Sequence, residues 1–223
     1  MSNFFEILVT YKEGFLLGLK VTLELCLLVW SIGIILGSLL GVLSAKYDKS
    51  FFGDMTKTVS MLISGVPVIV FLYWLYYPLQ QQLNIDIPPF NIAVFALSFV
   101  NISMVADLVK NAIKELPNQY YLSAKVSGLS SKTFLIKIQI PLIFKQLVGP
   151  VLLVQITMLH SSIFASLINV DDIFRQIQRI NAIVYKPIEL YTALALFFIT
   201  ITTPLTLLAK YLKKKYARDY SER

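Results

Sequence analysis

ADLVKNAIKELPNQYYLSAKVSGLSSKTFLIKIQIP, residues 106–141, is a polar stretch that separates two long apolar ones at 90–112 and 142–168. Within it, Gly128 ends one helical pattern and Pro141 ends another, because glycine favours a helix C-terminus and proline cannot continue a regular helix. The stretch therefore predicts a helix-turn-helix outside the membrane, over approximately 114–141, between two membrane-spanning helices.

The composition supports a membrane protein. Hydrophobic residues make up 57% of the chain and charged residues 15%, and the mean hydropathy is +0.70. One soluble core of this length cannot hide that much apolar surface. Crossing the hydrocarbon takes about 20 mostly apolar residues. We expect an all-α integral membrane protein, one domain over 1–223, with five transmembrane helices near 15–45, 58–79, 90–112, 142–168 and 188–212.

Three glycines of the first apolar stretch recur at every fourth residue: Gly33, Gly37 and Gly41. Small residues at this spacing let a second helix approach closely inside a membrane. We interpret the stripe as a packing surface.

Lysine and arginine predict the orientation, because the cytoplasmic loops of membrane proteins retain them. Fifteen lie in the segments 46–57, 110–145 and 210–223, and four lie at Lys12, Arg175, Arg179 and Lys186. With five spans, this bias predicts an external N-terminus and an internal C-terminus. The net charge of +7 follows from the same bias, so it does not indicate nucleic-acid binding.

The spacing within 106–141 resembles the cytoplasmic coupling loop of the membrane subunits of ATP-binding-cassette (ABC) importers. That family has Glu-Ala-Ala, three residues, Gly, nine residues and Ile-x-Leu-Pro. The matching positions here are Leu122, Ser123, Ala124, Gly128, Ile138, Ile140 and Pro141. Leucine replaces the family's glutamate at 122, and the family's Arg-Gly-Thr-Pro on the second helix appears as Ser64-Gly65-Val66-Pro67.

A narrower resemblance is to the permease subunits for polar amino acids, histidine and basic amino acids among them. It is carried by Ala106-Asp107, Lys110-Asn111, Asn118-Gln119, Leu159-His160-Ser161-Ser162, Asp172, Ile180-Asn181-Ala182, Tyr185 and Pro187. The resemblance implies a multi-pass protein of the bacterial inner membrane that forms half of a pore. It also implies a second membrane subunit, cytoplasmic ATPase subunits that bind the ATP, and an external solute-binding protein. No cofactor of its own is expected.

The physical reading of the loop agrees with a coupling role. A pore driven by a separate ATPase needs a rigid cytoplasmic projection, and Tyr120, Tyr121, Leu122 and Leu129 offer apolar contact there. Gln119 precedes this apolar group. The alternative is an ordinary cytoplasmic loop whose lysines only fix the topology.

Charged residues inside the spans are costly and usually face a partner or a watery cavity. Asp107 and Lys110 lie three residues apart on one helical face, so we expect a structural ion pair. Glu24 lies four residues after Lys20, and it either pairs with Lys20 or faces the pore and favours a cationic substrate.

His160 is the only histidine, and with Ser161 and Ser162 it interrupts an apolar run. A lone buried histidine is often structural. A polar, weakened helix segment is also typical of a substrate pathway near the midplane, so Glu24, His160, Ser161 and Ser162 are candidate pathway residues.

Other signals are a predicted short external amphipathic helix within 169–187, lying against the membrane face, and the absence of catalytic motifs. The sequence has no Gly-x4-Gly-Lys-Ser/Thr phosphate loop, and one histidine with one cysteine gives no metal-ligand cluster. We therefore expect a transport subunit and not an enzyme. The alternatives are a gradient-driven secondary carrier, with Glu24, Asp107 and His160 as coupling sites, and a structural membrane anchor.

Overall fold

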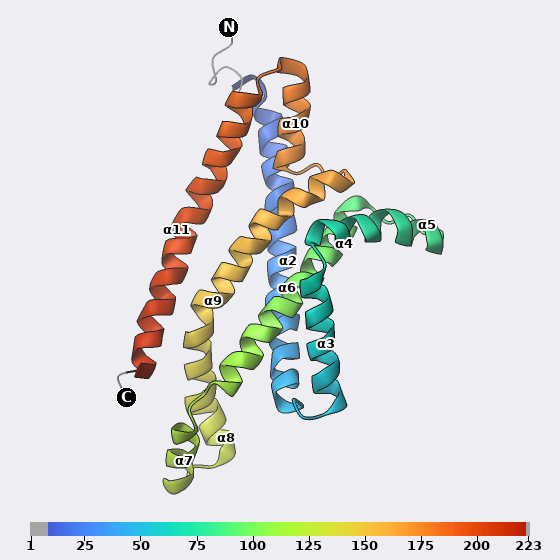
Figure 1. Cartoon of the computed structure of the whole chain (residues 1–223). Coiled ribbons are helices and arrows are strands. Elements are labelled where there is room, and N and C mark those ends of the chain that lie inside the picture. The colour runs from blue at the N-terminus through green and yellow to red at the C-terminus, as the bar shows by residue number, and fades with distance from the viewer. Residues whose placement is uncertain (1–8, 222–223) are drawn as a thin grey trace.

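The computed structural model describes residues 9–221 and, within that range, all side chains except those of 52, 64 and 217–221 (Figure 1). Arg223 of the basic C-terminal cluster and the side chain of Arg218 lie outside the described part. The described chain forms helices connected by short turns, without a strand. The first and last long helices both run from one end of the molecule to the other in the same direction, so the described chain starts at one end and stops at the opposite one (Figure 1).

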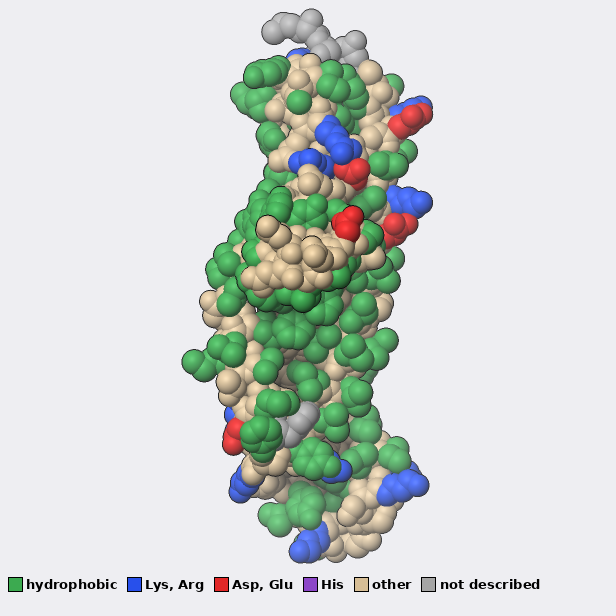
Figure 2. Space-filling view, turned by 90° about the vertical axis from the view of Figure 1, so that its right-hand side faces the viewer, with side chains coloured by type: hydrophobic (Ala, Val, Ile, Leu, Met, Phe, Trp, Pro, Cys, Tyr) green, Lys and Arg blue, Asp and Glu red, His purple; other side chains and the backbone are tan. Residues whose placement is uncertain are grey.

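Within residues 9–221, four helices are long and apolar enough to cross a membrane. They are α2 (Lys12–Lys46), α6 (Pro89–Lys114), the continuous helix Ser131–Ile168, and the part Pro187–Tyr216 of α11 (Pro187–Ser221). A fifth crossing exists if the bent pair α3 (Phe51–Gly65) and α4 (Val68–Trp74) is one span. A band of hydrophobic side chains separates the two ends of the molecule, where most of the charged side chains gather (Figure 2).

The second span differs from the straight helix predicted over 58–79. It is broken after Gly65, and the following helical segment is inclined by 95° to the first. Proline favours an extended conformation in the residue before it, and Val66 has φ −104° and ψ 122°. After Pro67, α4 continues through a π-helical turn, Leu75–Leu79, into α5 (Gln80–Leu83), and this arm projects sideways from the bundle (Figure 1).

The fourth span also differs from its predicted bounds, because its helix does not begin after Pro141. It starts at Ser131 with α8 (Ser131–Phe134) and passes through a π-helical turn, Leu135–Gln139, into α9 (Ile140–Ser161). Pro141 lacks an N–H and clashes with the carbonyl four residues earlier in an α-helix. A wider turn directly before the proline relieves that conflict, so the loop's second helix and the span form one continuous helix.

The glycine stripe of α2 packs closely against α6, which confirms the predicted packing surface. A Cβ added at Gly33 would lie 2.2 Å from Asn101 Nδ2, and one at Gly37 would lie 2.8 Å from Val105 Cβ. At Gly41 it would lie 2.7 Å from the Ala106 carbonyl oxygen. Any side chain at these positions would push α6 away from α2.

The amphipathic helix predicted within 169–187 is α10 (Ile173–Val184). It runs alongside the N-terminal part of α2, instead of lying across the membrane face (Figure 1). A Cβ at Gly18 would lie 2.8 Å from the Ile173 Cα, and Thr22 Oγ1 accepts a hydrogen bond of 3.0 Å from the Ile173 N–H. The glycine and the hydroxyl on α2 thus create the docking place for α10.

Candidate functional site

The predicted polar helix-turn-helix is present as α7 (Asn118–Val126) followed by α8. Gly128 has φ +65°, a conformation that residues with a side chain rarely adopt. The Leu129 N–H donates to the Ala124 carbonyl at 3.0 Å, and the Gly128 N–H donates to the Lys125 carbonyl at 3.2 Å. This pair of bonds closes the helix end as a Schellman motif, so Gly128 defines where α7 stops and turns.

Two aromatic rings hold α7 against α8. Tyr121 meets Phe134 edge to face at 6.0 Å between ring centroids, and Phe134 and Ala124 are buried between the two helices. Ser130 caps α8 by accepting a hydrogen bond of 3.2 Å from the Thr133 N–H. The projection is therefore built as a small packed unit.

An apolar surface covers the outside of this unit. It consists of Tyr121, Leu122, Val126 and Leu129, whose side chains are 57%, 58%, 89% and 41% exposed; we call it the α7 surface. Sequence reasoning named three of these residues and missed Val126, which follows Leu122 at helical spacing. Because exposed apolar residues gathered in one place mark an interaction site, the α7 surface has the character of a docking surface.

The other residues predicted for the coupling loop are distributed differently. Gln119 and Ser123 are exposed on α7, whereas Ala124 is buried beneath it. Ile138 is half-buried within the π-helical turn, and Pro141 is exposed one turn later in the continuous helix. Ile138 and Pro141 therefore belong to the helix that supports α7.

A group of charged side chains lies next to this unit, where the turn after α2 meets α3 and the end of α6. Asp48 is at its centre, with the Nζ of Lys110 at 3.2 Å, of Lys114 at 2.5 Å and of Lys57 at 3.5 Å from its carboxylate oxygens. The bonds to Lys114 and Lys110 hold the pKa of the Asp48 carboxyl well below its usual range. We call this group the Asp48 cluster.

The predicted pair Asp107–Lys110 is wrong. Among the described residues, Lys110 forms its ion pair with Asp48, and Asp107 accepts a hydrogen bond from the Ser60 hydroxyl. Spacing along one helix suggested a local pair, but the acid that Lys110 uses comes from a turn more than sixty residues earlier in the chain. Lys110 is almost fully buried there.

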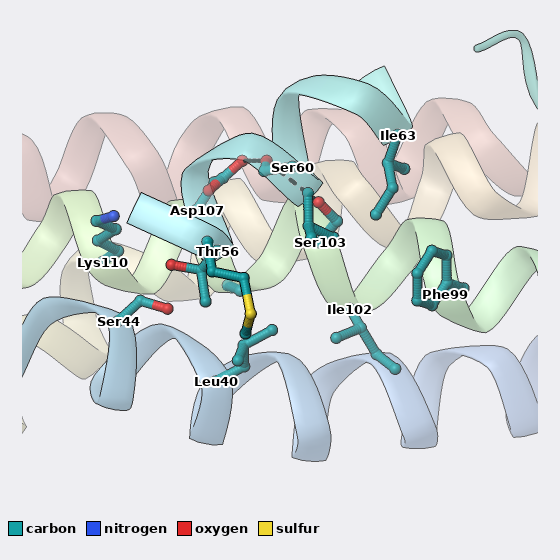
Figure 3. Close-up of a pocket in the computed structure, with 13 residues that line it drawn as sticks. Leu40, Ser44, Thr56, Ser60, Ile63, Phe99, Ile102, Ser103, Asp107 and Lys110 are labelled. Atoms are coloured by element: carbon teal, nitrogen blue, oxygen red, sulfur yellow. Dashed lines mark hydrogen bonds between the residues drawn. The ribbon is translucent and has the colours of Figure 1, made fainter. Parts of the chain in front are cut away.

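A cavity of about 160 Å³ lies between α2, α3 and α6 (Figure 3). Lys110 of the Asp48 cluster is part of its lining. Ser103 donates to the Ser60 hydroxyl at 3.2 Å, and Ser60 donates in turn to Asp107. These three side chains come from α3 and α6 and point toward one another at the cavity wall (Figure 3). The rest of the lining is mainly apolar.

The candidate pathway residues lie apart from one another. Glu24 lies 3.8 Å from Lys20, and both side chains are more than half exposed. His160 is exposed at the end of α9, with its ring 6.2 Å from that of Phe198. Ser161 and Ser162 are buried, and Ser162 donates to the Leu159 carbonyl at 2.8 Å. Of this polar segment, only His160 therefore presents its side chain at the surface of the chain.

A buried pair of amide side chains at the centre of the bundle was not predicted from the sequence. Asn101 Nδ2 donates to the Val29 carbonyl at 3.0 Å and to Gln155 Oε1 at 2.9 Å, which joins α2, α6 and α9. The signal in the sequence was an amide inside each of two apolar runs, opposite the glycine stripe.

Asp172 is a second buried polar residue, located in the connection before α10. Its carboxylate is fully buried and caps α10 by accepting a hydrogen bond of 2.8 Å from the Arg175 N–H. Burial raises the pKa of the carboxyl to about 7. Within the described residues, no three His, Cys, Asp or Glu side chains gather as ligands of a metal ion would.

Comparisons with known proteins agree with this architecture. A family model described as "Binding-protein-dependent transport system inner membrane component" matches residues 33–218. The glutamine transport system permease protein of Escherichia coli (strain K12) is 24% identical over 203 residues, which are 89% of this chain and 90% of that protein. An arginine ABC transporter permease protein of Haemophilus influenzae is 26% identical over 176 residues, or 76% and 80% of the two chains.

Two solved structures share the fold. One is an amino acid ABC transporter with histidines, with a TM-score of 0.82 and 24% identity, covering 96% of this chain and 99% of the other. The second is an inward-facing methionine ABC transporter, with a TM-score of 0.69 and 18% identity, covering 90% and 95% of the two chains.

Proposed function

Because the chain belongs to the family of binding-protein-dependent transport system inner membrane components, we propose that it forms half of the translocation pathway of an ATP-driven importer for polar amino acids, basic ones in particular. The chain is a permease component of an amino-acid ABC transporter, located in the inner membrane. It is not an enzyme, since ATP is hydrolysed by a separate subunit. Family membership favours this function over a secondary carrier or an anchor.

The α7 surface is the place where this subunit takes up the motion of the ATPase. Four exposed apolar side chains on a unit that is closed by Gly128 and held by the Tyr121–Phe134 contact support this assignment. The orientation that follows has the α7 surface and the C-terminus in the cytoplasm and the N-terminus outside. The lysine bias of the sequence supports the same orientation.

The partner membrane subunit is a different chain, with an intact acidic residue at the position of Leu122. A carboxylate there can accept charge-assisted hydrogen bonds of roughly 1.5–3 kcal/mol each, whereas Leu122 contributes only apolar contact. One weak and one strong half can still transmit the motion. Purification of the tagged chain with its neighbouring gene products should yield two distinct membrane subunits in equal amounts, and a functional transporter with this chain as its sole membrane component would refute the heterodimer.

Relatives named for glutamine and for arginine support polar and basic amino acids as the substrate class. The exposed side chain of His160 supports a substrate pathway along this part of α9. His160 is a polar ring at the chain surface, where a second subunit can complete the pathway. A cysteine at position 160, in a Cys26→Ala background, should react with a small charged thiol reagent at a rate that changes with ATP. No reaction in any state would return His160 to a structural role.

Uptake into reconstituted vesicles tests the function itself. The complex should import labelled polar or basic amino acids when ATP and the binding protein are present, and should import none without ATP. Leu122→Asp with Val126→Asp should reduce both co-purification of the ATPase and substrate-stimulated ATP hydrolysis. Ile183→Asp, which alters an exposed isoleucine (70%) on α10, should leave co-purification unchanged. Normal stimulation in the α7 variant would exclude the coupling role.

A further inference from the structure

Helix α3 is attached to the bundle unlike the other long helices. Of its described residues only Gly53 is buried, and two of its larger apolar side chains are strongly exposed, Phe51 at 85% and Met61 at 77%. Inside a membrane, helices are held together by close van der Waals packing and by hydrogen bonds between them, and a helix with one buried residue has little of the former. The packing of α3 against α2 and α6 is therefore weak.

Empty space lies along the inner face of α3. The cavity of about 160 Å³ beside Ser60 also borders Ile63, and Ile63 borders a second cavity of about 180 Å³ that reaches Val66 and Phe71. By contrast, the seam between α2 and α6 has no room for one additional carbon atom at Gly33. Close packing fixes the α2–α6 pair, while α3 has space to move against it.

Apart from Ile63, which packs against the main hydrophobic core, α3 is held mainly by polar contacts. The relay from Ser103 through Ser60 to Asp107 joins its middle to α6 (Figure 3), and Lys57 joins its first half to Asp48 at 3.5 Å. The net contribution of such hydrogen bonds is small. A helix held in this way belongs to the least stable part of a fold, from which moving elements are drawn.

Both ends of α3 are breaks where the chain direction can change. A turn over Tyr47–Ser50 precedes it, and the extended residues Val66 and Pro67 follow it at the 95° bend. We propose that α3 is a hinged panel that moves away from α2 and α6 during the transport cycle, and that the Ser103–Ser60–Asp107 relay is its latch. This inference rests on the proposed transport function.

Cysteine labelling tests the latch without measuring transport. Thr56 lines the cavity under α3, and Thr58 is exposed on the same helix. The labelling uses Thr56→Cys and, as its control, Thr58→Cys, each in a Cys26→Ala background. Ser60→Ala should raise the rate at which a thiol reagent modifies Thr56→Cys by about 2- to 10-fold, which corresponds to the net value of one hydrogen bond. The rate at 58 should not change. An unchanged labelling rate at position 56, or an equal rise at positions 56 and 58, would refute the role of the Ser103–Ser60–Asp107 relay in holding α3.

A disulfide across the latch tests whether the motion is required. The hydroxyl oxygens of Ser60 and Ser103 lie 3.2 Å apart, so cysteines at both positions are within reach of a disulfide. Oxidation should abolish uptake by the double variant and a reductant should restore it, while each single variant stays active. Full uptake by the oxidised, cross-linked protein would refute the proposed movement of α3. Absence of uptake from the unmodified complex would count against the transport function, and the labelling result would still decide whether the latch exists.

Discussion

The Gly33→Ala substitution tests how closely α2 and α6 depend on each other. The added Cβ would lie 2.2 Å from Asn101 Nδ2 and 2.8 Å from Asn101 Cβ, whereas carbon atoms in contact keep roughly 3.5–4.0 Å. Rotating the amide cannot relieve this overlap, because the Asn101 Cβ is fixed to the backbone. Helix α6 must move away, and Asn101 must give up its bonds to Val29 and Gln155.

The magnitude follows from two costs. Overpacking of a close contact costs about 1–3 kcal/mol, and a buried amide left without partners costs about 1–3 kcal/mol more. A change of about 4 kcal/mol in a chain of this size lowers the melting temperature by on the order of 10 °C. The apparent melting temperature of the purified subunit in detergent, followed by tryptophan fluorescence, measures it.

Gly65→Ala is the matched control, because a Cβ at Gly65 would meet no atom within 4 Å. It should melt within a few degrees of the natural protein. If Gly33→Ala melts no lower than Gly65→Ala, then the seam between α2 and α6 is not closely packed and the reasoning fails.

Three further predictions concern the turn, the buried acid and the charged cluster. Gly128→Ala should slow substrate-stimulated ATP hydrolysis about fivefold, because the left-handed backbone conformation costs about 1 kcal/mol for a residue with a Cβ. Gly128→Asn should hydrolyse ATP at close to the natural rate. Equal rates in the natural protein and both variants would contradict this prediction. Burial raises the pKa of Asp172 to about 7 from 3.8, so between these values the folded state binds a proton that the unfolded state has lost. The melting temperature should therefore fall as pH rises from about 4 to about 7. Asp172→Asn should remove that dependence, and the same pH profile in the variant and the natural protein would refute the prediction. Lys110→Met should lower the melting temperature more than Lys57→Met, since Lys110 is buried and Lys57 is half exposed; the reverse order would show that the Asp48 cluster does not depend on its buried lysine.

Several features of the fold were predictable because they follow from rules that act along one helix. Long apolar runs indicate spans, and the spacing of Gly33, Gly37 and Gly41 indicates a close helix contact. The break at Pro67 was visible as a proline, but its 95° bend depends on how α4 packs against α6. Pro141 was misread as a helix end, because a π-helical turn can accommodate a proline that an α-helix cannot.

The candidate site could be predicted in part for the same reason. The exposure of residues in a polar loop, such as Leu122, can be predicted without knowing the rest of the fold. The ion-pair partner of Lys110 cannot be predicted in this way, since Asp48 and Lys110 meet only after α2 and α6 have packed along the glycine seam. The Ser60–Asp107 contact is a similar long-range pairing, and neither pair leaves a signal in local spacing.

The continuous helix from Ser131 to Ser161 has a mechanical consequence. It contains 31 residues in succession, so at 1.5 Å per residue it is a lever arm of roughly 45 Å. Tilting such an arm by about 5° displaces its far end by roughly 4 Å, which is about the width of a methyl group. One end of the arm carries the partner helix of α7 and the other ends next to His160. When this helix moves as one body, a small rotation at the end next to α7 therefore becomes a displacement as large as a side chain at the opposite end.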